Sequence, residues 1–394
     1  MTDGSATRAP MLAGIRILDM TSVVFGPYAT QVLAELGAEV IKVEAPGGDV
    51  FRQAGQPAVT PGMGPCHLGL NRGKQSICLD LRDAADRKAF DALLTTADVF
   101  IHNVRGAAIA RLGYAPEAVR ALRPDIIYAH CVGFGGDGPN GGRQAYDDVI
   151  QAASGATSLL GRVDGDPRPR YLHSLIADKV AGLHAVYAVL AAIIHRLRTG
   201  EGQAIEIPMF EAFTSFLLKE HLYGAALSPP REPIGYPRQL DPNRQPFPTL
   251  DGHIAIVPYT DDSTVRLLRV LGGEAILADP DFDTPARRGA RMSEIYRRIG
   301  ELTRARTTAD WCERLHQAGI PAMPTRDLAD ILDDPHLVAT GFFRTETHPT
   351  EGDYVRMAQP VRFGAVAEFE LCPAPALDRD GAAIRATLPS HTKD

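Results

Sequence analysis

The sequence has few cysteines and no motif that would join them. Its 394 residues include 5 Cys, widely spaced and without a C-x-x-C pair, so neither a disulfide framework nor a zinc site is indicated. We therefore expect reduced thiols in a cytoplasmic protein. HExxH, G-x-S-x-G and His pairs at ligand spacing are also missing, which argues against a metal site and against serine-hydrolase chemistry.

An excess of positive charge is missing as well. Lys and Arg number 41 against 48 Asp and Glu, giving a formal net charge of -7, whereas a nucleic-acid surface needs a basic excess or stripe. The N-terminus has no signal-peptide core, and the longest apolar run, around 186–194, is too short to span a bilayer. We expect neither a nucleic-acid partner nor a membrane partner.

The sequence does contain a regular alternation of short apolar strands and helical stretches. "GIRILDM", a helix with Pro27 in its first turn, and "EVIKVEAP" form a βαβ unit. The pattern continues through "SICLDL", a helix over 83–97, "DVFIHNV" and "DIIYAHCVGFG". This alternation predicts an α/β fold with a doubly wound, Rossmann-like parallel sheet, in which ligands bind where strands end and helices begin.

A change in composition follows near residue 228. "SPPREPIGYPRQLDPNRQPFP" is typical of a linker, and hairpins are predicted at Asp251-Gly252 and at Glu351-Gly352. We predict a large domain from 1–227, a smaller α+β domain with linkers over 228–325, and a segment over 326–394 that returns to the large domain.

Two glycine-containing motifs resemble nucleotide-binding loops. "GFGGDG" at 133–138 matches G-x-G-x-x-G after a strand, but "PNGG" follows where a helix should begin, so a nicotinamide-dependent dehydrogenase is disfavoured. "GLNRGKQ" at 69–75 is one residue short of a phosphate loop and has Gln75 in place of Ser or Thr. Neither motif predicts nucleotide chemistry.

Several cations stand at the predicted strand ends. Each alone is typical of a solvated surface, but together, at the ligand edge of a doubly wound sheet, they could hold the phosphates of a cofactor. They are Lys42, Arg72, Lys74, Arg105, Arg111 and Arg143.

A single carboxylate, Asp178, precedes about twenty apolar, helix-forming residues. By sequence alone it is most simply the N-cap of that helix, where a carboxylate is favoured by capping and by the macrodipole. The other interpretation is a nucleophile, because a carboxylate can attack an activated acyl group and form a covalent intermediate. The small neighbours Ala177, Ala181 and Gly182 would leave room for a substrate.

Taken together, these segments resemble a known family along nearly the whole chain. "GIRILDMTSVVFGPYATQVLAELGAEVIKVEAPGGD", "NRGKQSICLDLR", "ADVFIHNVRGAAIARLGY" and "ADKVAGLHAVYAVLAAIIHRLRTGEGQAIEIPMFEA" are similar, in order, to the class III CoA-transferases, the family of formyl-CoA and carnitine CoA-transferases. The resemblance implies that Asp178 is the catalytic nucleophile and that coenzyme A is a substrate, with no tightly bound cofactor.

The resemblance also implies a site and an assembly. It implies a homodimer of interlocked rings, and CoA transfer from an acyl-CoA to a carboxylic acid through aspartyl anhydride and thioester intermediates. The positions that match the family's CoA contacts are Phe25, Leu70, Arg72, Lys74, Asn103, Val104, Arg111, Arg143 and Tyr146.

Other activities stay open at this point. An α-methylacyl-CoA racemase of the same family would carry a His where Tyr146 stands, although His130 or His173 could replace it. Intramolecular transfer within a dicarboxylic acyl-CoA is a second alternative, and a catalytically inactive acyl-CoA-binding protein would be expected to lack Asp178.

Overall fold

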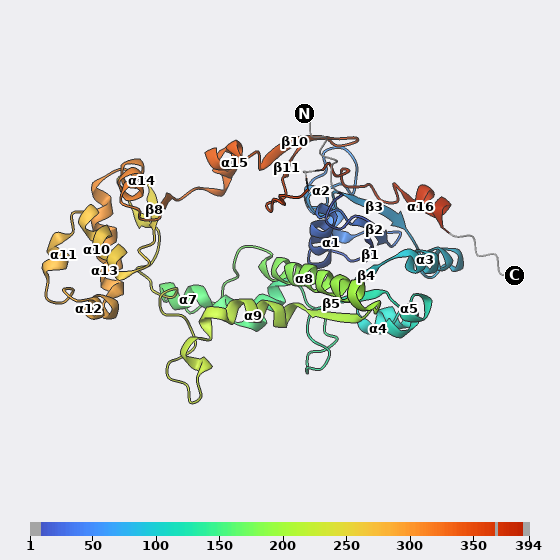
Figure 1. The fold of residues 1–394 in the computed structure, drawn as a ribbon, viewed down its shortest axis with the longest axis horizontal. Coiled ribbons are helices and arrows are strands. Elements are labelled where there is room, and N and C mark those ends of the chain that lie inside the picture. The colour runs from blue at the N-terminus through green and yellow to red at the C-terminus, as the bar shows by residue number, and fades with distance from the viewer. Residues whose placement is uncertain (1–8, 367–368, 389–394) are drawn as a thin grey trace. The chain divides into compact units, whose positions relative to one another are not determined.

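The computed structural model describes residues 9–366 and 369–388, which form two compact units (Figure 1). The first unit draws on Met1–Thr157, Tyr171–Leu218 and Ala339–Asp394, and the second on Ser158–Arg170 and Lys219–Val338. The domain limits at 227 and 325 stay predictions from the sequence.

A six-stranded parallel sheet with the order β3-β2-β1-β4-β5-β6 organises the first unit. Its inner strands are buried on both faces, which explains their nearly continuous apolar sequences. The predicted α/β class and parallel sheet are confirmed. The strands are β1 (Arg16–Met20), β2 (Glu39–Glu44), β3 (Lys74–Cys78), β4 (Val99–His102), β5 (Ile127–Val132) and β6 (Ala204–Pro208).

Helices cover both faces of this sheet. On one face α1 (Phe25–Glu35) packs along α8 (Ile176–Thr199), and α8 also contacts β5 and β6. The opposite face holds an apolar core with Phe100 and Tyr128 at its centre. The helices that contribute to that core are α3 (Ala84–Thr96), α4 (Gly106–Arg111), α5 (Pro116–Leu122) and α16 (Gly381–Thr387).

The remaining elements of the first unit lie around the sheet and its edges. The hairpin of β10 (Phe343–His348) and β11 (Gly352–Met357) forms at the predicted Glu351-Gly352 turn. Near the end of the chain, Asp378 and Asp380 accept backbone N–H bonds from β3. The other elements are η1 (Val50–Gln53), α2 (Pro65–Leu70), α6 (Asp147–Ser154), η2 (Ala156–Ser158) and most of α9 (Met209–His221).

The second unit has its own core around Trp311 and Leu315. A three-stranded sheet of β7 (Phe247–Pro248), β8 (His253–Ile256) and β9 (Ala322–Pro324) is antiparallel throughout, and the β7-β8 hairpin at Asp251-Gly252 is confirmed. The other elements that fall wholly or mostly in this unit are α7 (Leu159–Asp164), η3 (Tyr223–Ala226), α10 (Asp261–Val270), α11 (Glu274–Ala278), α12 (Pro285–Ala290), α13 (Met292–Leu302), η4 (Thr303–Ala305), α14 (Thr308–Gln317), η5 (Leu328–Asp333) and α15 (Pro335–Ala339).

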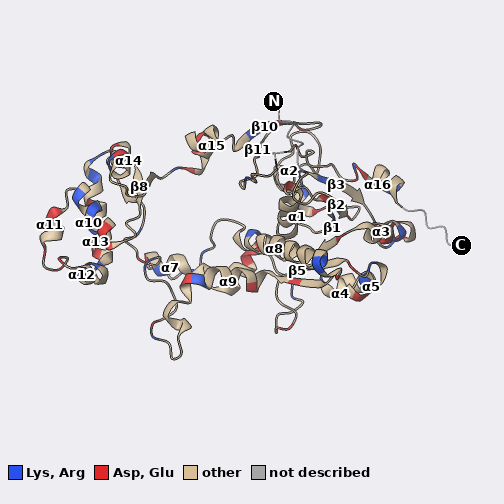
Figure 2. Ribbon diagram, in the orientation of Figure 1, with Lys and Arg blue, Asp and Glu red and all other residues tan. Residues whose placement is uncertain are grey.

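Helix α8 corrects the argument from the sequence that the longest apolar run is too short to span a bilayer. Its 24 residues are long and apolar enough to cross a membrane by length and composition alone, although the core helix of a soluble protein passes the same test. In this structure α8 packs on α1 and on the sheet, and its buried positions include Asp178. Lys and Arg positions are interspersed with Asp and Glu positions along the described helices and loops of both units (Figure 2).

Candidate active site

The strand order reverses between β1 and β4, and this switch point lies beside the start of α8. In open α/β sheets ligands bind outside the carboxyl ends of the strands at such a point. The turn after β1 leads into α1, and Gly182 of α8 packs on that helix so closely that a Cβ would lie 3.0 Å from the Phe25 carbonyl oxygen. The glycine therefore brings the first turn of α8 against the first turn of α1.

Asp178 is the third residue of α8, and the N-cap position belongs to Leu175. The N-cap interpretation of Asp178 is therefore wrong, because the side chain makes no capping bond and lies inside the helix. The residue is only 5% exposed. No cation pairs with its carboxylate in the part of the chain that the structure describes, which is unusual for a buried charge.

Burial is the main cause of the electrostatic state of Asp178. Desolvation, followed by the negative charges of Asp147 and Asp148, raises the pKa of its carboxyl from 3.8 to about 7. The nearby backbone N–H of Phe25 acts in the opposite direction and lowers the pKa. A carboxylate with such a pKa is weakly stabilised as an anion and is more basic than an ordinary aspartate.

Asp147 fixes the position of this nucleophile candidate from α6. Its Oδ2 accepts the Asp178 backbone N–H at 3.0 Å, and its Oδ1 accepts Gln151 Nε2 at 2.5 Å. Gln151 in turn bonds the Leu172 N–H at 2.8 Å and the Ser174 carbonyl at 3.1 Å. This network satisfies one of the first N–H groups of α8, which have no acceptor within the helix. Sequence reasoning missed Asp147 as a site residue, although it had considered its neighbour Tyr146.

Three of the predicted CoA contacts lie at the switch point. Phe25 is buried at the first position of α1. Asn103 follows β4, and its side chain accepts the Ser22 N–H at 3.0 Å and donates to the Ser22 carbonyl at 2.9 Å. Val104 comes next, and its carbonyl is 2.9 Å from His130 Nε2. These residues join the ends of β1, β4 and β5 around the start of α1.

Two of the predicted cations are internal instead of facing a ligand. Lys74 Nζ is buried and donates to Asp19 Oδ2 at 3.2 Å, to the Pro27 carbonyl at 3.0 Å and to Asn71 Oδ1 at 2.9 Å, which uses all three N–H bonds of an ammonium group. Lys42 Nζ is likewise buried and pairs with Asp49 at 3.2 Å. The strand-end argument for phosphate binding is therefore corrected for Lys42 and Lys74.

The other predicted contacts vary in exposure. Arg72 is buried beside Glu346 of β10, with a separation of 3.4 Å, and Leu70 is half-buried at the end of α2. The exposed members are Arg111, Arg143 and Tyr146. Their assignment to CoA remains a prediction.

The "GFGGDG" loop has its amides occupied by the protein itself. The Gly135 N–H donates to Glu211 Oε1 at 3.1 Å, and the Gly136 N–H donates to Glu206 Oε1 at 2.9 Å. Two carboxylates thus stand where a dinucleotide loop would receive its pyrophosphate. This geometry agrees with the disfavoured nicotinamide interpretation.

The two histidines considered as racemase bases lie in different surroundings. His130 is partly buried, stacks on His102 with ring centroids 4.4 Å apart, and burial lowers its pKa. His173 is exposed. In the described residues no group of His, Cys, Asp and Glu could hold a metal ion.

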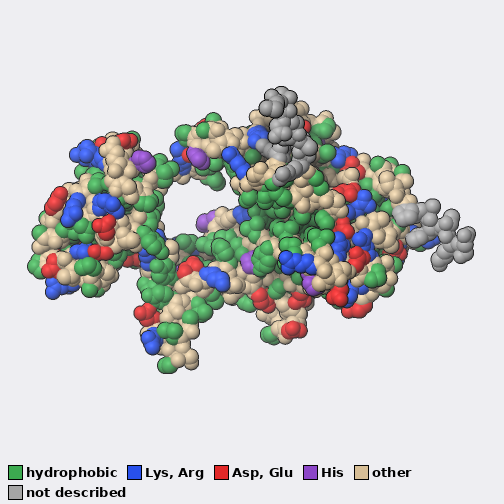
Figure 3. Space-filling view, in the orientation of Figure 1, with side chains coloured by type: hydrophobic (Ala, Val, Ile, Leu, Met, Phe, Trp, Pro, Cys, Tyr) green, Lys and Arg blue, Asp and Glu red, His purple; other side chains and the backbone are tan. Residues whose placement is uncertain are grey.

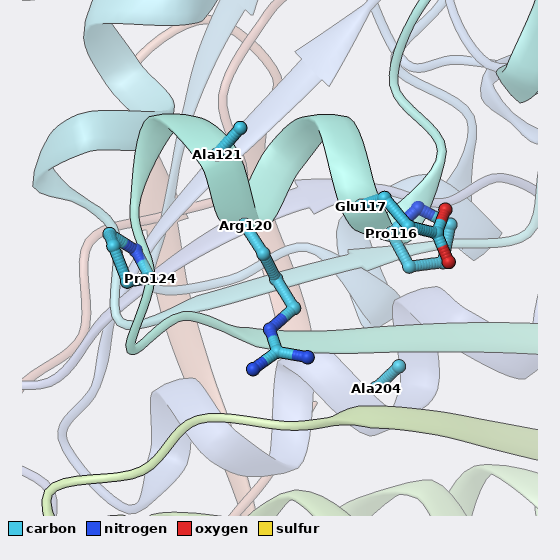
Figure 4. Close-up of a pocket in the computed structure, with 6 residues that line it drawn as sticks. All are labelled: Pro116, Glu117, Arg120, Ala121, Pro124 and Ala204. Carbon is cyan, nitrogen blue, oxygen red and sulfur yellow. The ribbon is translucent and has the colours of Figure 1, made fainter.

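A surface cavity of about 390 Å³ lies elsewhere on the first unit, along α5 and at the amino end of β6 (Figure 4). Pro116, Glu117 and Arg120 of α5 contribute to its lining, together with Ala204 of β6. The cavity contains none of the residues assigned to the site.

Fold and site together define an α/β protein with a buried carboxylate at the switch point of its parallel sheet. Over residues 12–381 the chain matches CoA-transferase family III. It is 33% identical over 364 residues to a succinate–glutarate CoA-transferase of Agrobacterium fabrum, covering 90% of this chain and 89% of the relative. It is 31% identical over 386 residues to a succinyl-CoA:mesaconate CoA-transferase of Haloarcula hispanica, covering 95% of each.

A solved structure agrees with these sequence matches. The crystal structure of a CAIB/BAIF family protein from Brucella suis has a TM-score of 0.81 and 30% sequence identity, covering 97% of this chain and 100% of that one. The chain therefore belongs to CoA-transferase family III. It is an enzyme of a family that uses CoA thioesters as substrates.

Proposed function

We propose that this enzyme moves CoA from an acyl-CoA to a carboxylic acid through covalent intermediates on Asp178. The observation that carries the proposal is a buried carboxylate with no cation beside it in the described chain, on a helix that packs against the start of α1. Burial destabilises the anionic form of such a carboxylate, which favours attack of its oxygen on an acyl carbon.

The reaction balances as four transfers. The Asp178 carboxylate attacks the thioester carbonyl and expels CoA thiolate, leaving a mixed anhydride. The thiolate attacks the aspartyl carbonyl, which releases the donor acid and leaves an aspartyl-CoA thioester. The acceptor carboxylate then attacks this thioester and expels the thiolate, which attacks the acceptor acyl carbon. The products are the new acyl-CoA and the free Asp178 carboxylate.

Each tetrahedral intermediate carries an oxyanion, and the start of α1 supplies the group that would stabilise it. The first N–H groups of a helix have no intrahelical acceptors and lie at the positive end of the macrodipole. The Phe25 N–H lies near enough to the Asp178 carboxylate to lower its pKa. Developing charge at the same place would be stabilised without reorganisation.

The substrate class we propose is a short dicarboxylic acyl-CoA with a dicarboxylate acceptor. Two relatives that cover most of the chain are named for succinate, glutarate and mesaconate transfer. For CoA itself we propose contacts from Phe25, Leu70, Asn103, Val104, Arg111, Arg143 and Tyr146, with Arg72 and the internal Lys74 supporting the loop behind them. We also propose that no other cofactor is bound tightly and that the enzyme is cytoplasmic.

We further propose that the enzyme is a homodimer with interlocked chains. The outer face of α8 carries exposed apolar side chains, and hydrophobic residues gather on the surface over α1 and α8 (Figure 3). An apolar stripe of this kind marks an interface more often than a free surface. The stripe consists of Leu183, Tyr187, Ile194 and Leu197.

Intact-mass measurement tests the proposed function directly. The enzyme is incubated with succinyl-CoA, glutaryl-CoA, formyl-CoA and acetyl-CoA in turn, with and without hydroxylamine, beside Asp178→Ala. We expect a CoA adduct on Asp178 that hydroxylamine removes, with the highest yield for the natural donor, and none in the variant. An enzyme that forms no adduct but exchanges the α-proton of a 2-methylacyl-CoA in deuterated water would be a racemase.

A further inference from the structure

The turn between β1 and α1 contains a strained residue. Val23 has φ of +71°, the left-handed region that glycine adopts freely and that a β-branched residue adopts only when its surroundings impose it. Strain of this kind persists where neighbouring groups hold it. The contacts of Val23 and its neighbours show which groups do so.

A buried ion pair holds the turn from one side. The two carboxylate oxygens of Asp49 accept the Val23 N–H at 3.0 and 3.2 Å. Lys42 Nζ lies 3.2 Å from Asp49 Oδ2 and donates to the Thr21 carbonyl at 2.8 Å. The pair therefore bonds both the residue at the strained position and the residue two before it. Asp49 is 6% exposed and Lys42 is fully buried.

Side chains of two other strands hold the turn from the other sides. Asn103 bonds both the N–H and the carbonyl of Ser22. Asp19 accepts the Thr21 N–H at 2.9 Å and the Thr30 hydroxyl at 2.6 Å. The turn is thus fixed on each side of Val23, while the Val23 N–H itself depends on Asp49.

The strained residue stands two positions before the start of α1, which packs against the helix that carries Asp178. The Phe25 carbonyl lies 3.0 Å from the position of a Cβ at Gly182 of α8, and the Phe25 N–H lowers the pKa of Asp178. A rotation at Val23 would therefore move the first turn of α1 relative to α8 and to the Asp178 carboxylate. A displacement of about 1 Å in a catalytic group can cost about a hundredfold in rate.

We propose that Asp49 is a positioning residue, which holds Val23 in its left-handed conformation and so aims the start of α1 at Asp178. The proposal rests on the proposed function of Asp178. It assigns Asp49, in the "PGGD" segment, a role in the chemical step. It predicts that replacing Asp49 lowers turnover more than it weakens substrate binding.

A double-mutant cycle separates this role from general stability. Asp49→Asn keeps an oxygen for the Val23 N–H but removes the charge that pairs with Lys42, and we expect kcat to fall about tenfold or more while KM for the acyl-CoA donor stays within about twofold. Val23→Gly adopts the same φ without strain. In that background we expect Asp49→Asn to lower kcat by about threefold or less, because contacting residues couple.

Controls keep the outcome clear. Asp98→Asn is the matched variant, since Asp98 also accepts a backbone N–H, from Arg16 at 2.7 Å, but at the amino end of the sheet. It should leave kcat unchanged. If Asp49→Asn folds poorly beside the unpaired Lys42, Asp49→Asn/Lys42→Met removes both charges and should show the same selective fall in kcat. Amide hydrogen exchange should rise at 21–27 in the Asp49 variants and not in Asp98→Asn.

Two results would overturn the proposal. One is an equal loss of kcat from Asp49→Asn with Val23 and with Gly at position 23. The other is unchanged exchange at 21–27 when Asp49 is replaced. A wild-type enzyme without the hydroxylamine-sensitive adduct would instead remove the proposed function, while the exchange result would still report on the turn.

Discussion

Two turns of the first unit follow parallel strands, and their glycine content is a poor guide to how each is used. The "GFGGDG" turn after β5 has four glycines, yet carboxylates of Glu206 and Glu211 occupy its amides. The "TSVVFG" turn after β1 has one glycine and a strained valine, yet it leads into the helix start that packs against α8, the helix of Asp178. Carboxylates of Asp19 and Asp49 accept the Thr21 and Val23 N–H groups of this turn, so the N–H groups that an anion could approach are those that follow, at the start of α1.

The comparison shows that the glycine count of a loop is a poor guide to its use. What decides the use is where the backbone N–H groups point and whether the protein has already satisfied them. The turn after β1 holds its shape through Asp49 and Asn103, so it can present its following amides to a ligand. The predictions below test this difference.

The largest expected effect follows from replacing Asp178, the proposed nucleophile. Asp178→Asn removes the attacking oxygen anion and keeps the size of the side chain, so CoA transfer should fall by at least about a thousandfold. Steady-state transfer between a dicarboxylic acyl-CoA and a free dicarboxylate measures it. Retention of more than about a tenth of the activity would contradict the proposed role.

A matched pair of glycine substitutions compares the two turns directly. A Cβ at Gly26 would lie 2.3 Å from the Thr21 Cβ, whereas one at Gly136 would lie 3.3 Å from the end of the Glu206 side chain. We expect Gly26→Ala to lower kcat about a hundredfold by shifting the start of α1. Gly136→Ala should change kcat by less than about twofold. Equal losses from the two variants would remove the distinction between the turns.

The buried carboxylate of Asp178 should also lower the stability of the fold at neutral pH. The pKa of Asp178 is raised from 3.8 to about 7, so the folded chain keeps a proton that the unfolded chain releases, and this contribution to stability is lost as pH rises from about 4 to about 7. Asp178→Asn should therefore raise the free energy of unfolding by about 3 kcal/mol at pH 8 and much less at pH 4. Urea unfolding at both values measures it, and an equal change at both would contradict the buried charge.

The smallest predicted effect is a shift in pH dependence. Because Asp178 must be ionised to attack, kcat should fall as pH drops below about 7. Asp147→Asn removes a nearby negative charge and keeps an oxygen for the Asp178 N–H, so the acid limb should move about one pH unit lower. Asp148→Asn, at an exposed position, should shift it less. An acid limb that stays in place in Asp147→Asn would show that another group controls it.

Much of the fold of both units was predictable because its signals are local. The βαβ pattern from Gly14 to Pro46 gave the parallel sheet, and the turn residues at Asp251-Gly252 and Glu351-Gly352 gave the hairpins. The stretch 285–302 forms two helices, α12 and α13, divided at Arg291. Helix propensity alone does not reveal such a break.

The site was less predictable because its contacts are distant in sequence. Asp147 and Asp178 are bonded across 31 positions, so the residues around Asp178 favoured an N-cap, and only the family resemblance favoured a nucleophile. Lys74 was assigned to phosphate because the sequence alone did not identify the carboxylate that pairs with it. A signal existed in "GIRILDM", since Asp19 inside an apolar strand requires a buried cation or several donors.

The uncompensated carboxylate of Asp178 has a consequence for evolution in the laboratory. A selection for heat resistance alone would favour its replacement, since the fold gains stability when the charge is removed and nothing but turnover is lost. A variant library screened only for melting temperature would therefore enrich for inactive chains with an intact sheet. Any effort to raise the thermal stability of this enzyme has to screen for CoA transfer in the same round.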